Sequence, residues 1–109
     1  MDAREERLAR NEALFREVNE RVRAIAALHG DDGHQYEFFC ECSNRDCDLK
    51  LTLSVAAYEG VRDHSEWFFV APGHSLPEVE AVIESRDGYD IVAKDGDAAL
   101  LSEELDPRS

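Results

Sequence analysis

The stretch YEFFCECSNRDC, residues 36–47, is the part of this chain from which the fold is best worked out. It holds all three cysteines of the protein, Cys40, Cys42 and Cys47, within eight positions. The aromatic residues before Cys40 are typical of a β-strand, and residues 43–46 are turn-forming. The stretch therefore predicts a strand that enters a turn carrying three thiols.

The spacing of these thiols favours a metal site. A turn can bring both cysteines of a Cys-x-Cys pair to one side, and the loop to Cys47 is short enough to add a third sulfur. Zinc prefers four tetrahedral ligands, and thiolate and imidazole groups suit it. We therefore expect Cys40, Cys42 and Cys47 to hold zinc in a closed, structural site that is completed by a histidine. The alternatives are three buried cysteines that act as small hydrophobic residues, a redox-active cluster, or an iron–sulfur cluster, which usually needs other spacings.

Four histidines compete for the fourth ligand position. His74 is favoured because it belongs to the rigid turn Pro72-Gly73-His74, which follows an apolar run and would hold a side chain well. His34 is second, because it lies two residues before the aromatic strand and can reach back. The weaker candidates are His29 and His64, which would end helices, and Asp46 inside the loop.

The segments around the cysteines predict two β-hairpins. Leucines alternate with polar residues over 49–53, so this segment reads as a strand that returns from the cysteine turn and pairs with residues 36–42. Residues 67–71 are wholly apolar and predict a buried strand. A second hairpin is expected around Asp87-Gly88, although a helix that begins near residue 75 is an alternative.

Helices are expected before, between and after these strands. Residues 2–28 predict one long helix, in which Leu14, Val18, Val22 and Ile25 form an apolar stripe that Leu8, Phe15 and Leu28 widen. We expect this stripe to pack on the helix's own domain, and a dimerisation helix is the alternative. Thr52 or Ser54 can cap a short helix that ends near residue 62. A terminal helix is possible over 98–105, with frayed residues after it.

The length of 109 residues suits one domain, with a helix over 2–28, an α+β core over 34–95 and an acidic tail over 96–109. The chain has 12 basic and 25 acidic residues, and a net charge of -13 repels phosphate backbones and anionic membranes. We therefore expect no nucleic-acid or membrane partner, while a protein partner fits. Because the N-terminus has no secretory pattern, we expect a cytoplasmic protein with reduced thiols.

The order of several motifs runs through most of the chain: residues 11–20, 39–42 with Cys47, 51–53, 58–62, 69–74, 77–80 and 87–89. This order resembles a family of small uncharacterised bacterial proteins that is common in actinobacteria. The resemblance implies that the cysteines and the turn at 72–74 belong together, which supports His74 as a ligand, and it implies no activity. Members of the family carry an acidic residue in the first turn of the short helix, where this chain has Ser54-Val55-Ala56-Ala57.

These features together predict a non-catalytic protein-interaction or regulatory module. A closed metal site leaves no position for a reacting water, and the chain contains neither a glycine-rich phosphate loop nor a nucleophile elbow. We expect Glu37, Glu41 and Asp46, the carboxylates near the cysteines, to point to solvent. The alternative function is a thiol-based redox sensor or metal-responsive sensor, and an enzyme comes third. A monomer or weak dimer is expected.

Overall fold

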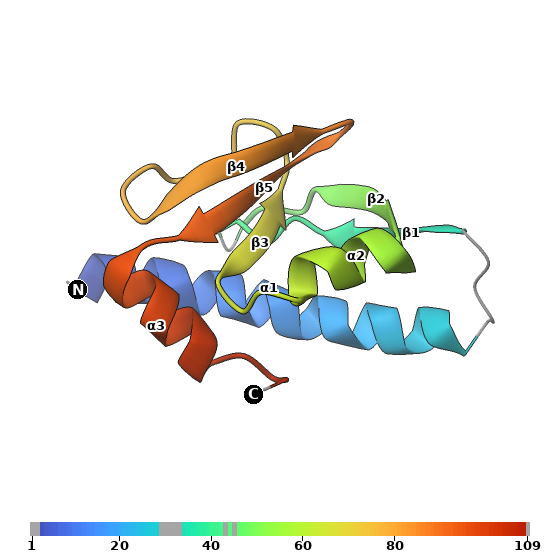
Figure 1. Ribbon diagram of the computed structural model, residues 1–109, viewed down its shortest axis with the longest axis horizontal. Helices are drawn as coiled ribbons and strands as arrows, with labels where there is room; N and C mark the ends of the chain where they lie inside the picture. Colours follow the sequence, from blue (N-terminus) through green and yellow to red (C-terminus); the bar gives the residue numbers. More distant parts are fainter. Residues whose placement is uncertain (1–2, 29–33, 43, 45, 109) are drawn as a thin grey trace.

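The fold was derived from a computed structural model that describes residues 3–28, 34–42, 44 and 46–108 (Figure 1). The expected α+β architecture is confirmed, with a long N-terminal helix, two small antiparallel sheets and two shorter helices. The elements are α1 (Ala3–Ala27), β1 (Gln35–Phe39), β2 (Lys50–Ser54), α2 (Val55–Arg62), β3 (Trp67–Val70), β4 (Glu80–Arg86), β5 (Tyr89–Lys94) and α3 (Gly96–Glu104).

Both predicted hairpins form, although the first strand ends at Phe39 and not at Cys42. β1 and β2 pair antiparallel, with Phe38 opposite Leu51, and the cysteine segment connects the two strands. β4 and β5 pair around the turn at Asp87-Gly88, where Gly88 has a φ of 90°, a conformation that a glycine adopts without steric cost. β3 pairs with the other edge of β5, which gives the order β3-β5-β4.

The core lies where the two sheets meet α2. The ring of Phe38 in β1 stacks on Tyr58 in α2 with centroids 4.6 Å apart, and the edge of Phe69 in β3 meets both rings. Ser54 is the N-cap of α2, since its hydroxyl accepts a hydrogen bond from the amide of Ala57. This cap turns the chain directly from β2 into the helix, so that Tyr58 and Val61 face the core as the helical period requires.

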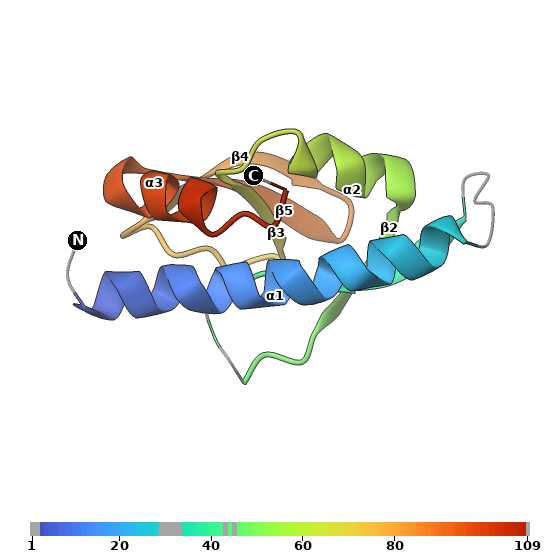
Figure 2. The same cartoon turned by 90° about the horizontal axis from the view of Figure 1, so that it is seen from below.

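α1 spans the long axis of the molecule and lies along the sheets, α2 and α3 (Figures 1 and 2). At about 1.5 Å per residue, its 25 residues are about 38 Å long, which accounts for most of the 42 Å extent of the domain. The helix packs on its own domain, as expected. The predicted end of α1 at residue 28 lies one residue beyond its observed end, and the loop over residues 30–33 lies outside the described residues.

The predicted apolar stripe of α1 is only partly buried: Val22 packs against the core, and Leu8, Phe15 and Val18 are half-buried. Leu14, Ile25 and Leu28 are 51%, 60% and 84% exposed, whereas five residues outside the stripe are fully buried. The helix is rotated relative to the expectation because its buried face is mostly polar, with partners supplied by the strands and the C-terminal segment. The buried residues of α1 are Ala9, Glu12, Arg16, Asn19 and Ala26.

The segment after α3 makes ion pairs as far as Arg108. Asp106 is buried against Arg62 of α2, with Oδ1 2.6 Å from Nη2. Arg108 donates hydrogen bonds to Glu20 and Glu59. These bonds connect Asp106 and Arg108 to α1 and α2, and the fraying of the last residues stays a prediction.

Among the helices of the described residues, none combines the length and the apolar character that crossing a bilayer requires.

Candidate metal centre

The three cysteines and His74 come together because two chain segments leave the sheets side by side. The chain continues past β1 through Cys40 and Glu41, and the amide of Glu41 donates to the carbonyl of Phe69 in β3 at 3.0 Å. The amide of Ala71, just after β3, lies 3.1 Å from the Cys40 sulfur. The segment that follows β1 and carries Cys40 and Cys42 therefore lies beside the end of β3. The chain continues from the end of β3 to His74.

A tight turn after β3 presents His74 to the cysteines. The amide of His74 donates to the carbonyl of Ala71 at 3.0 Å, which closes a four-residue β-turn. Pro72 and Gly73 occupy its central positions, and the φ of Gly73 is 83°. Proline followed by a glycine of positive φ is the pattern of a type II turn, so this local sequence encodes the direction of the imidazole.

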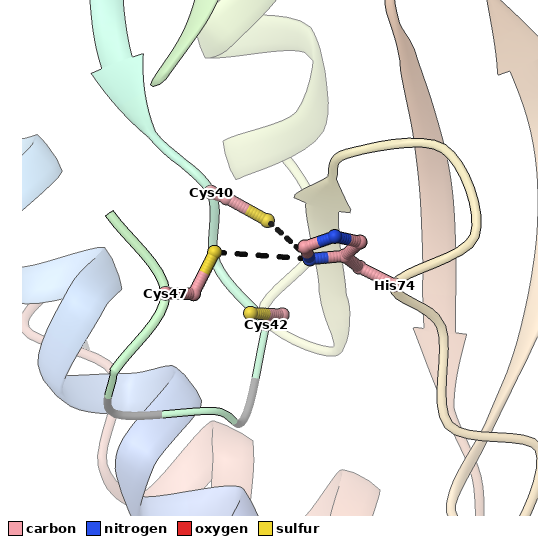
Figure 3. A group of neighbouring side chains, drawn as sticks. All are labelled: Cys40, Cys42, Cys47 and His74. Atoms are coloured by element: carbon pink, nitrogen blue, oxygen red, sulfur yellow. Dashed lines mark hydrogen bonds between the residues drawn. The ribbon is translucent and has the colours of Figure 1, made fainter. Parts of the chain in front are cut away.

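The ligand atoms of the four residues lie within 4.8 Å of one another (Figure 3). His74 Nδ1 lies 3.7 Å from the sulfurs of both Cys40 and Cys47. Ligand bonds of about 2.3 Å to sulfur and 2.0 Å to nitrogen in a tetrahedron would put sulfur and nitrogen about 3.5 Å apart. The group can therefore hold a metal ion, and all four predicted site residues meet.

The three thiols influence one another's ionisation through hydrogen bonds. A hydrogen bond from Cys40, with further ones that include His74, lowers the pKa of the Cys42 thiol to about 5. The hydrogen bond to Cys42, together with burial, raises the pKa of Cys40, and burial raises that of Cys47. One thiol thus ionises at the expense of the others, and a bound dication would supply the positive charge that allows all three to ionise.

The centre is open to solvent on one side. Cys40 and Cys42 are 1% and 3% exposed, whereas Cys47 and His74 are half-buried. A hollow of about 270 Å³ begins at this edge of the site. Its lining residues are Cys42, Asn44, Gly73, His74, Ser75 and Leu76. Small molecules can therefore approach the sulfur and imidazole groups from this side.

The other predicted candidates lie away from the centre. His34 is exposed and is not among the residues whose ligand atoms converge, and Asp46 is exposed at the loop. The ring of His64 stacks on Trp67, with centroids 3.7 Å apart, at the end of α2. His29 lies outside the described residues. Of the histidines that are described, His74 is the one that reaches the cysteines.

The expectation that Glu41 points to solvent is wrong. Its side chain is fully buried, and its carboxylate accepts hydrogen bonds from Asn19 Nδ2 at 3.0 Å and from the amide of Phe69 at 3.4 Å. Burial, opposed by the nearby Arg16, raises the pKa of Glu41 to about 7. Glu37 and Asp46 are exposed, as expected.

Alternation along a strand contained a signal for Glu41, because neighbours of two inward-facing cysteines must point to the other side. What covers that other side could not be known from the sequence. The partner is Asn19 of α1, a residue that the apolar pattern of the helix gave no reason to select.

Comparisons with protein-family models, with curated proteins and with solved structures found no match for this chain. The site is therefore interpreted from its own geometry and chemistry.

Proposed function

We propose that this protein is a small domain stabilised by a structural zinc ion, and that it serves as a non-catalytic protein-interaction or regulatory module. The observation that supports the zinc site is the convergence of Cys40, Cys42, Cys47 and His74 within 4.8 Å. Three sulfurs and one imidazole nitrogen form a donor set that zinc prefers. Cations such as Mg²⁺ and Ca²⁺ prefer oxygen ligands instead.

The position of the centre supports a structural role. With four protein ligands, no coordination position remains for a reacting water. The ion would join the segment after β1 to the turn after β3, which hydrogen bonds already hold together at Glu41 and Ala71. Because such a site is not preformed in the unfolded chain, the free energy of metal binding would contribute to folding.

Metal analysis of the protein purified under reducing conditions tests the zinc proposal. We expect one zinc per chain, and we expect Cys42→Ser and His74→Ala to lose zinc and to melt at lower temperature. His34→Ala is the matched control, because it removes an exposed imidazole outside the cluster. Absence of metal from the wild type would refute the site, and zinc retained by His74→Ala but lost from His34→Ala would refute the assignment of His74.

The net charge of -13 supports a protein partner, preferably a basic one, over nucleic acid or an anionic membrane. We place the protein in the cytoplasm, where thiols stay reduced and free to bind metal. Sedimentation is expected to show a monomer or weak dimer. Binding of the zinc-loaded protein to DNA or to phosphatidylserine vesicles at 0.15 M salt would contradict this part of the proposal.

A thiol-based redox or metal-responsive sensor is the second candidate, and the hollow beside Cys42 and His74 favours it. Peroxide would take two electrons from two thiolates, which would join as a disulfide, while peroxide and two protons from solvent form two water molecules and zinc is released. Rapid zinc release by micromolar peroxide, followed with a chromophoric chelator, would support a sensor. Zinc that withstands the same treatment would support a purely structural ion.

A further inference from the structure

The segment Cys40-Glu41-Cys42 has two functional sides. The thiols of Cys40 and Cys42 face the metal centre, whereas the carboxylate of Glu41 is buried and bonded to α1. A single three-residue segment thus contacts both the metal centre and the long helix. Any shift of this segment must move the ligands and the contacts with α1 together.

Asn19 of α1 holds this segment with three hydrogen bonds. Its Oδ1 accepts from the amide of Phe39 at 2.7 Å, and its Nδ2 donates to the carbonyl of Phe39 at 2.9 Å and to Glu41 Oε2 at 3.0 Å. A primary amide has two N–H donors and one carbonyl acceptor, so Asn19 is well matched to these partners. The contacts fall on the residue before Cys40 and on the residue between Cys40 and Cys42.

Glu41 extends this connection to the strand that leads to His74. Its Oε1 accepts a hydrogen bond from the amide of Phe69. In return, the amide of Glu41 donates a hydrogen bond to the carbonyl of Phe69. Two residues further on, Ala71 donates to the Cys40 sulfur and begins the turn that ends at His74. Glu41 therefore belongs to one of the segments that carry ligands, and its side chain is hydrogen-bonded to the backbone of the other.

We infer that Asn19 and Glu41 position the metal ligands from α1, so that metal binding and the docking of α1 are coupled. The inference rests on the proposed metal site and names a mechanism by which that site would be regulated. Outer-sphere partners of this kind typically change metal affinity 10- to 100-fold. Linkage is reciprocal, so a docked helix that strengthens metal binding is itself held more firmly when the metal is bound.

The first test compares zinc affinities, measured by competition with a chromophoric chelator. We expect Asn19→Leu and Glu41→Leu to bind zinc about 10- to 100-fold more weakly than the wild type. The zinc affinity of the double variant should be no lower than that of the weaker-binding single variant, because both residues act through one connection. Glu37→Leu on β1 and Glu17→Leu on α1 are matched controls with exposed side chains, and their affinities should stay within about threefold of the wild type. Cobalt substitution should show altered d–d bands in the two buried-site variants only.

The second test uses the wild type alone and does not depend on whether a variant folds. Hydrogen exchange of the amides of residues 16–22 should accelerate when zinc is removed, and more than exchange in the β4–β5 hairpin. Wild-type zinc affinity in both variants, or exchange in α1 that rises no more than in this hairpin, would overturn the coupling while leaving the zinc site intact. A wild type that binds no zinc would instead overturn the proposed function itself.

Discussion

A buried ionic cluster of three residues connects α1 to the three-stranded sheet. The ammonium group of Lys94 contacts Glu12 and lies 2.6 Å from Glu80 Oε1, and all three side chains are almost wholly buried. Glu80 also accepts a hydrogen bond from the amide of Leu76. One positive charge between two carboxylates leaves an excess negative charge, which burial penalises. Burial raises the pKa of Glu12 well above its ordinary value, although the nearby Lys94 opposes this.

Glu12→Gln should change how stability depends on pH. The folded state retains a proton on Glu12 after the unfolded chain has released it near pH 4.5, so this contribution is complete below that pH and is lost as pH rises through the folded pKa. A glutamine does not titrate. We therefore expect the variant to gain stability relative to the wild type as pH rises from 5.5 to 8.5. Urea unfolding of both zinc-loaded proteins measures the difference, and parallel pH profiles would contradict the assignment.

At the scale of the element, the most deeply buried contacts of α1 are mostly polar, and its apolar stripe is only half-buried. The guanidinium of Arg16 lies 3.7 Å above the ring of Phe68 and donates to the carbonyls of Ser65 and Trp67. A buried charge of this kind stabilises a fold only when its hydrogen bonds are made, so it fixes the rotation and register of the helix closely. Leu14 and Ile25 remain exposed because the rotation of α1 that satisfies these hydrogen bonds turns both side chains to solvent.

The turn that carries His74 offers a sharp test at the same scale. Gly73→Ala should lower the free energy of unfolding by about 1 to 2 kcal/mol, because L-residues are disfavoured at positive φ, while the added methyl group meets no atom within 4 Å. Its zinc affinity should fall as well, since the turn aims the imidazole. Gly60→Ala in α2 is the matched control and should raise stability by about 0.5 to 1 kcal/mol. Chemical unfolding with and without zinc measures both, and equal effects of the two substitutions would contradict the role of the turn.

At the scale of the whole molecule, the C-terminal segment joins elements from both halves of the chain. Asp106 is bonded to Arg62 of α2 through two hydrogen bonds, and its Oδ2 lies 3.8 Å from Arg16 of α1. Glu20 of α1 accepts a further bond from Arg62 and one from the hydroxyl of Tyr58. The N-terminal helix and the segment after α3 are thus both connected to α2 by one network of charges.

Asp106→Ala should lower the free energy of unfolding by about 3 to 5 kcal/mol, because it leaves the buried Arg62 without its closest carboxylate. Arg108→Ala is the control, since its ion pairs with Glu20 and Glu59 are much more exposed and are worth about 1 kcal/mol or less. Thermal and urea unfolding of the zinc-loaded proteins give both values. A loss at Asp106 no larger than that at Arg108 would show that the network does not stabilise the terminus.

The sequence by itself determined the features that depend on neighbours along the chain. The spacing of Cys40, Cys42 and Cys47, the Pro72-Gly73 turn and the Asp87-Gly88 hairpin all act over a few residues, and each predicted its local structure correctly. The choice of His74 over His34 also followed from a local turn that restricts the side chain.

Only the tertiary structure decided which face of α1 is buried and where Glu41 points. Apolar periodicity assumes that a helix buries its hydrophobic residues, and this assumption fails when charged side chains find hydrogen-bond and ion-pair partners in the interior. The partners of Glu12, Arg16 and Asn19 lie between 20 and 90 positions away in the sequence, so no local sequence pattern predicts them. A polar group gains from burial only when a distant group completes its hydrogen bonds, and that condition is met in three dimensions alone.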